Sequence, residues 1–192
     1  MRFLIRLAPV PKDRDATLLA LRGIAATLGC RAVNPKWTSH GLLEIDVLAP
    51  SREDFRVLMA ALTPLCDVKL TKDLQEPPRF LPKEEAILES VALFNAERFW
   101  EAHEVLESLW RVEQGDEKRL LQGLILVCAA LVHMQKGEGP VALGIARRAL
   151  PLLVWREPTY HGLDVSRITE ALGQMIEQGA ITIFELSRRP EG

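Results

Sequence analysis

The octapeptide QEPPRFLP, at residues 75–82, constrains the fold more than any other stretch of the chain. Its three prolines lack a backbone donor and restrict φ, so neither a regular helix nor a central strand is expected to run through it. The residue pattern also changes there, because short apolar runs with period two precede it and long runs with helical spacing follow it. We therefore expect two domains, 1–74 and 83–192, joined by a semi-rigid linker at 75–82.

The first domain alternates strands and helices. Strands are expected at RFLIRLAP (2–9), CRAVNPKWT (30–38), LLEIDVLAP (42–50) and CDVKLTKDL (66–74). Apolar residues at helical spacing run through 13–30, where Gly29 is expected to end the helix. A second helix is expected over 52–65, with Ser51 as its N-cap. The order βαββαβ predicts a ferredoxin-like domain, in which a four-stranded antiparallel sheet carries both helices on one face. Because this fold hosts many unrelated functions, it predicts shape alone.

The second domain is expected to be an all-α helical bundle, so the fold class of the chain is α+β. Helices are expected near 83–96, 99–114, 116–136, 140–154 and 164–178, the last of them with Asp164 as its N-cap. Pro151 must end or kink the fourth helix, because it cannot donate to the carbonyl of Arg147. The segment AITIFEL, residues 180–186, fits a helix or a short strand, and both alternatives stay open.

Composition and charge argue against several classes of partner. The formal net charge is −2, with a mildly basic first domain and a mildly acidic second one, which does not predict nucleic acid as a partner. The expected sheet also lacks the stacking aromatic residues of an RNA-binding sheet. No apolar run reaches the ~18 residues of a membrane span. Cys30, Cys66 and Cys128 are odd in number and widely spaced, so we expect reduced thiols and a cytoplasmic location.

The candidate site lies on the expected helix 99–114. One side of this helix is an apolar stripe formed by Ala102, Val105, Leu106, Leu109 and Val112. The opposite side, within an arc of about 120°, carries Trp100, His103, Glu104, Glu107 and Trp110. Because a solvated face is not expected to carry tryptophan at both ends, we expect this second face to be covered as well. Covered carboxylates need a cation, an arginine, a set of donors or a metal ion as partners.

Two hypotheses follow for these side chains. In the first, His103, Glu104 and Glu107 bind a divalent metal ion or a small polar ligand, because residues three and four apart share one face of a helix. In the second, they form a structural hydrogen-bond network of a non-enzymatic interaction or regulatory protein, with Glu107 paired to Arg111. The sheet of the first domain would then mediate homodimer or partner contacts. The sequence shows no nucleophile–base pair, Gly-rich phosphate loop or complete metal motif to support catalysis.

The expected helix 116–136 adds two candidates. Within its apolar run LLQGLILVCAALVHM only Gln122 and His133 are polar, so this helix is expected at the centre of the bundle. These two side chains are separated by about 16 Å along the axis and cannot share one small ion. Antiparallel packing after the short turn EQGD places Gln122 level with Glu107. His133 is then a second candidate, expected as a hydrogen-bonded core histidine. Gly123 is small enough for another helix to approach closely.

The same residues resemble a known family. The matching positions are Phe94, Asn95, Phe99, Glu101, Ala102, His103, Glu104, Leu106, Glu107 and Trp110, then QGLI at 122–125, His133 and Gly137. Over about residues 84–165 the chain resembles the domain of unknown function 309 family, whose members are small, all-helical, mostly prokaryotic proteins without an established activity. The resemblance implies a helical fold and supports the choice of site residues, but implies no reaction. The chain departs from the family at Glu97, where glycine is frequent, at Leu126, where glutamine is common, and at Glu138, where asparagine is common.

Overall fold

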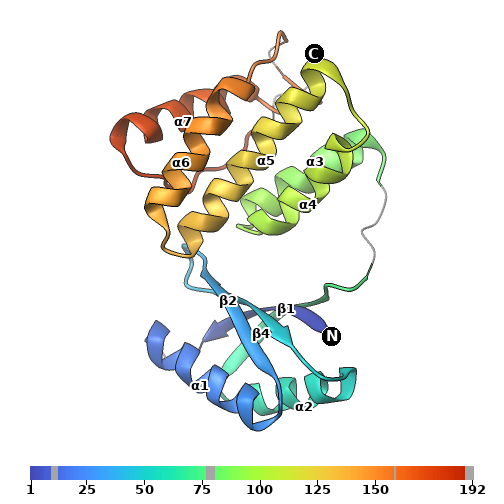
Figure 1. Ribbon diagram of the computed structural model, residues 1–192, viewed down its shortest axis with the longest axis vertical. Coiled ribbons are helices and arrows are strands. Elements are labelled where there is room, and N and C mark those ends of the chain that lie inside the picture. The colour runs from blue at the N-terminus through green and yellow to red at the C-terminus, as the bar shows by residue number, and fades with distance from the viewer. Residues whose placement is uncertain (10–12, 77–80, 158, 189–192) are drawn as a thin grey trace. The chain divides into compact units, whose positions relative to one another are not determined.

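The computed structural model divides into two compact units, Met1–Pro77 and Pro78–Gly192. It describes residues 1–9, 13–76, 81–157 and 159–188, so residues 77–80 of the expected linker lie outside the described part. The chain combines helices with a four-stranded antiparallel sheet and is therefore of the α+β class (Figure 1). Among the described residues, no helix has the length and apolar character required to cross a membrane.

The first unit contains the sheet. Its elements are β1 (Arg2–Pro9), α1 (Arg14–Thr27), β2 (Arg31–Trp37), β3 (Leu43–Leu48), α2 (Arg52–Leu62) and β4 (Cys66–Asp73). The strands pair antiparallel in the order β2-β3-β1-β4, and α1 and α2 lie along one face of the sheet (Figure 1). Both expected helix ends are present: Ser51 Oγ accepts from the Asp54 amide at 3.1 Å, and Gly29 follows α1 with a φ of +68°.

Apolar and polar residues alternate along the strands, which gives the sheet an apolar face and a charged face. On the apolar face the ring of Phe3 stacks on Phe55 of α2, with centroids 3.9 Å apart. On the charged face Arg6 of β1 donates to Glu44 of β3 at 2.8 Å, and Lys36 of β2 lies 2.5 Å from the other oxygen of that carboxylate. Glu44 is thus neutralised by one cation from each neighbouring strand, which favours this register of the sheet.

The second unit contains the helices α3 (Lys83–Asn95), α4 (Phe99–Trp110), α5 (Gly115–Gln135), α6 (Gly139–Ala149) and α7 (Val165–Gln178), with the 3-10 helix η1 (Leu150–Leu152) after α6. α5 lies between the α3–α4 pair and α6 with α7 (Figure 1). Pro151 stands inside η1, so the expected helix 140–154 ends as an α-helix at Ala149. The expected helix 99–114 ends at Trp110, which leaves Val112 in a turn and exposed instead of in the apolar stripe. Residues 180–186 form neither helix nor strand.

Gly123 sets how closely η1 packs against α5. A Cβ atom at this position would lie 2.9 Å from Leu153 Cδ2, 3.1 Å from Leu152 Cβ and 3.2 Å from the Leu152 carbonyl carbon. The last of these atoms is backbone and cannot move by a rotamer change. Gly123 was expected to let another helix approach closely, and the element that approaches it is η1.

We expect Gly123→Ala to destabilise the protein by roughly 1–2 kcal/mol, because the overlap with η1 outweighs the ~1 kcal/mol that alanine gains over glycine inside a helix. Chemical unfolding followed by circular dichroism measures the change. Gly144→Ala in α6 is the matched control, because nothing lies within 4 Å of a Cβ at that exposed position. The control should be slightly more stable than wild type, and an equal gain for Gly123→Ala would contradict the steric assignment.

Candidate functional site

The turn between α3 and α4 determines where the candidate helix begins. Glu97 has a φ of +56°, in the left-handed region that favours glycine, which accounts for the glycine frequent at this position in the family that the chain resembles. The carbonyl oxygen of Glu97 accepts from Nε2 of the buried Gln135 at 3.1 Å. The start of α4 is thereby held to the end of α5.

The sequence-predicted residues occupy the side of α4 that faces away from the core. Ala102, Leu106 and Leu109 are buried, as the apolar stripe predicts. His103, Glu104, Glu107 and Trp110 are half-buried. Trp100, however, is 38% exposed, so the expectation of a fully covered second face is wrong for this residue. Its ring stacks on that of His103. We call Trp100, His103, Glu104 and Glu107 the α4 face.

Trp100 and His103 form a stacked pair. Their ring centroids are 5.2 Å apart and their planes differ by 7°, as side chains one helical turn apart permit. Burial lowers the pKa of His103 below its ordinary value, although Glu107 and Glu104 act in the opposite direction. The imidazole is therefore neutral at pH 7. Its Nδ1 atom is inaccessible and has no hydrogen-bond partner within the described part of the chain.

The two carboxylates of the α4 face differ in their partners. Glu107 Oε1 accepts from Arg111 Nη2 at 3.0 Å, which is the i, i+4 pair of the structural hypothesis. The side chains are 35% and 65% exposed, and solvent screening limits such a pair to less than about 1 kcal/mol. Glu104 has neither a hydrogen bond nor an ion pair among the described residues. Glu104 is therefore the carboxylate with free acceptor capacity.

The geometry does not support a metal ion on the α4 face. Across the ranges that the structure describes, no group of three or more His, Cys, Asp or Glu side chains is arranged to hold a metal ion. The three expected ligands, His103, Glu104 and Glu107, all come from α4. Metal sites in helical bundles draw ligands from facing helices, and the neighbouring helices contribute none here.

Two further predicted residues lie near the other end of α4 and on α5. Trp110 is half-buried, and the Nζ atom of Lys118 lies 4.5 Å from its ring centroid in a cation–π contact. Gln122 is also half-buried and makes no hydrogen bond to any described residue. Gln122 is therefore not hydrogen-bonded to Glu107, although the two were expected at one level.

His133 lies at the end of α5, half-buried, with its Nδ1 atom in contact with the carboxylate of Glu138. The expected hydrogen bond is thus present, but the core position is wrong, because the ring is half-buried and reaches the loop before α6. Its partner Glu138 is one of the positions at which the chain departs from the family it resembles.

Sequence reasoning missed a buried ion pair in the first turn of α4. Glu101 is only 3% exposed and Arg98 is 26% exposed. Nε and Nη2 of Arg98 donate to the two carboxylate oxygens of Glu101, each at 2.6 Å, in a bidentate arrangement. The i, i+3 spacing was the available signal, but spacing alone does not distinguish a buried pair from an exposed one.

A second ionic cluster, also missed, joins three distant parts of the helical unit. Lys83 Nζ at the start of α3 lies 2.7 Å from Glu113 Oε1 and 2.8 Å from Glu117 Oε1. The hydroxyl of Tyr160 donates to the same oxygen of Glu117 at 2.7 Å. Burial by itself would raise the pKa of Glu117, but the hydrogen bonds from Lys83 and Tyr160 outweigh it and the pKa is lowered. No local spacing could have revealed a cluster assembled by tertiary contacts.

Glu101→Gln should destabilise the protein by about 2 kcal/mol, because it leaves the largely buried Arg98 guanidinium without its carboxylate. Glu107→Gln is the matched control, since it makes the same change to another Glu–Arg pair on α4, and it should cost less than about 1 kcal/mol. Urea unfolding of both variants measures the difference. Equal losses of stability in the two variants would mean that burial does not make the Arg98–Glu101 pair more stabilising than the Glu107–Arg111 pair.

The stability lost in Tyr160→Phe should depend on pH. Because the folded-state pKa of Glu117 lies below its ordinary value of 4.5, this carboxylate stabilises the fold above that pH, and the contribution disappears as pH falls. Removing the Tyr160 hydroxyl should cost about 1 kcal/mol at pH 7 and less as the pH falls and Glu117 becomes protonated. Urea unfolding of both proteins between pH 7 and pH 3 measures this difference in stability. A difference that does not change with pH would mean that the Tyr160 hydroxyl does not act through Glu117.

Comparison with known proteins finds matches to part of the chain. The crystal structure of a conserved hypothetical protein from Thermus thermophilus is 34% identical to this chain, over 51% of this chain and 99% of that chain, with a TM-score of 0.42. No curated protein matches the chain. The family described as "Domain of unknown function (DUF309)" matches residues 87–144, a range that contains the whole α4 face. Through these residues the chain belongs to the domain of unknown function (DUF309) family.

Proposed function

We propose that the helical unit is a ligand-binding module and that the α4 face binds a small organic cation. The observation that carries the proposal is the stack of Trp100 on His103, which leaves the indole partly exposed on the same face as Glu104. An aromatic face attracts an ammonium or guanidinium group, and a nearby carboxylate adds a charge-assisted hydrogen bond. Lys118 makes a contact of the same kind with Trp110 at the other end of this helix, which supports the choice of ligand.

The charges on the α4 face favour a cation over an anion. His103 is neutral at pH 7 because burial lowers its pKa. Glu107 is balanced by Arg111, while Glu104 has no ion-pair partner among the described side chains. The face therefore carries an unbalanced negative charge beside an aromatic surface, and this combination is the usual recognition chemistry for organic cations.

A divalent metal ion is the less favoured occupant. The ligands expected for it come from a single helix, and one nitrogen of His103 is inaccessible. An organic cation needs no complete coordination sphere, because the aromatic face and a single carboxylate suffice.

The second candidate function is a non-enzymatic interaction protein in which the α4 cluster is structural. The Glu107–Arg111 ion pair favours this alternative, since it satisfies one carboxylate locally without any ligand. In that case the exposed Trp100 has no role in small-ligand binding, and the α4 face should bind neither an organic cation nor a metal ion.

Titration of the full chain with methylguanidinium, tetramethylammonium and a panel of divalent metal ions distinguishes these functions. Binding is measured by calorimetry and by the NMR signal of the His103 ring. We expect millimolar binding of an organic cation, and Trp100→Ala or Glu104→Gln should each weaken it by roughly fivefold, or about 1 kcal/mol. Affinity should also fall as the pH drops through the pKa of His103, which burial holds below the ordinary 6.5, because protonated His103 repels a cation.

Glu177→Gln provides the control, because it removes an exposed carboxylate from α7 and should leave the affinity unchanged. Organic cations that bind wild type and both α4 variants equally would overturn the proposal. A single tight site for a divalent metal, lost in Glu104→Gln, would instead restore the metal alternative. Absence of all binding would leave the interaction function as the better account.

We also infer that the first unit is a ferredoxin-like domain. The element order βαββαβ, the central position of β1 and β3 and the packing of α1 and α2 on one face support this assignment. A cytoplasmic location is supported by Cys30, Cys66 and Cys128, which are buried, unpaired thiols.

A further inference from the structure

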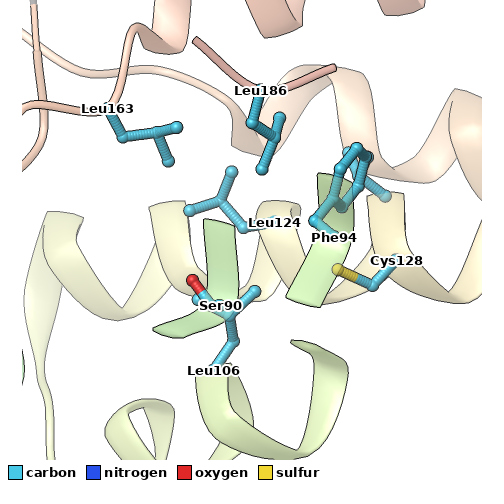
Figure 2. A pocket seen from close by; sticks show the side chains of 8 residues that line it. Ser90, Phe94, Leu106, Leu124, Cys128, Leu163 and Leu186 are labelled. Atoms are coloured by element: carbon cyan, nitrogen blue, oxygen red, sulfur yellow. The ribbon is translucent and has the colours of Figure 1, made fainter. Parts of the chain in front are cut away.

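A depression on the surface of the first unit is large enough to hold a small molecule. In the helical unit, by contrast, Leu186 points towards Leu124 and closes a cavity to about 10 Å³, which scarcely admits one water molecule (Figure 2). The depression of the first unit is open and has a volume of about 440 Å³, within the range of small-molecule sites. The residues that line it include Arg2, Gly29, Arg31, Leu48 and Pro50.

The register of the sheet places two arginines in one row with a leucine between them. Arg2 of β1 and Arg31 of β2 both pair with Leu48 of β3, which is the strand between them. Residues directly opposite each other in an antiparallel pair point to the same face of the sheet, so both arginine side chains leave the sheet on one side. Because neighbouring strands lie ~4.8 Å apart, the two arginines are separated by roughly 10 Å at the backbone, and their long side chains can reach one small anion.

A second row of cations on the same face differs from this one at its centre. There Lys36 and Arg6 lie on either side of Glu44, and both form ion pairs with its carboxylate. In the row of Arg2 and Arg31 the central residue is apolar and offers no charge. The sheet therefore repeats the arrangement of two cations about a central position without supplying an anion there.

The charges around the depression leave one cation unbalanced. Arg2 donates from Nη2 to Asp46 at 2.5 Å, and this carboxylate also accepts from Asn34 at 2.9 Å. The exposed guanidinium of Arg31 makes neither an ion pair nor a hydrogen bond with any described residue. None of the described residues that line the depression is acidic. A ligand with a single negative charge would thus balance Arg31, and Arg2, whose side chain is 47% exposed, has further N–H groups to donate to it.

We propose that this depression binds an organic monocarboxylate with an apolar body. The planar donor groups of Arg31 and Arg2 match the two oxygens of a carboxylate. Leu48 and Pro50 offer apolar surface to the rest of the ligand. Gly29 leaves the space beside Pro50 open, since a Cβ there would lie 3.9 Å from Pro50 Cγ and a longer side chain would extend into it.

Titration of the full chain with benzoate tests this site, with the amide NMR signals of Leu48 and Gly29 as the measure of binding. We expect a dissociation constant in the millimolar range. Arg31→Gln should weaken binding by about fivefold, because it removes the unbalanced charge, and Arg31→Lys should recover part of the loss. Arg22→Gln is the matched control, since it removes an exposed arginine from α1 and should bind benzoate like wild type.

Two analogues of benzoate separate its charge from its shape. Benzyl alcohol has the ring without the charge and should bind at least about fivefold more weakly than benzoate. Binding of both compounds with equal affinity would overturn the proposal, because the arginines would then contribute nothing. Phenyl phosphate should bind no more tightly than benzoate, and a preference for it of tenfold or more would contradict the assignment of a monocarboxylate.

A folded Arg31→Gln protein that binds benzoate as tightly as wild type would also overturn the proposal. Because Arg31 is exposed, we expect this variant to fold, and circular dichroism checks that it does. This inference does not depend on cation binding by the α4 face, which belongs to the other unit.

Discussion

The helical unit depends on the enclosure of α5. This helix is apolar on nearly every side, and such a helix is stable only when other elements cover it all round. Leu120, Leu121, Leu124, Cys128 and Leu131 are all buried along its length. The α3–α4 pair covers one side and α6 with η1 another, where Gly123 allows the closest approach. The short turns on either side of α5 follow from this requirement, because they return the chain directly onto the helix that it must cover.

The unit keeps its charges at the edges of this core, in pairs whose burial differs. Glu101 and Arg98 form a bidentate pair that is largely removed from water, and Lys83 of α3 joins Glu113, in the turn before α5, and Glu117 of α5. Such pairs act chiefly by making alternative packings costly, since an unpaired buried charge is strongly unfavourable. The Glu107–Arg111 pair is open to solvent and restricts little. The Glu107–Arg111 pair therefore costs less to separate than the Arg98–Glu101 pair.

The α4 face and the place where the chain's own segment 180–188 packs meet at the α3–α4 turn. Phe94 contacts Phe184 of the extended segment on one side and Phe99, the first residue of α4, on the other, with centroids 4.9 Å apart in the second pair. Trp100 and the α4 face begin at the next residue. The asparagine that binds the segment, Asn95, also stands in this turn, beside Glu97 in its left-handed conformation. The family match therefore covers a stretch in which turn geometry, aromatic packing and backbone recognition occur together.

The sequence by itself determined the elements and their order. Period-two and helical spacing predicted the α+β class, and Gly29, Ser51, Asp164 and Pro151 marked helix ends within a few residues, because capping and proline geometry act locally. It also selected His103, Glu104 and Glu107 as neighbours on one helical face, since that follows from the pitch of a helix.

Only the tertiary structure decided which side chains are covered and by what. Trp100 proved exposed and Glu101 buried, although both lie in the first turn of α4, because burial depends on which elements pack there. The Lys83–Glu117–Tyr160 cluster and the Asn95–Leu186 bonds join residues 34, 43 and 91 positions apart. Residues 180–186 fitted either a helix or a strand because the segment is too short for its apolar residues to define a period. Contacts of this segment with Asn95 and Phe94 favour the extended form, and no local pattern encodes those contacts.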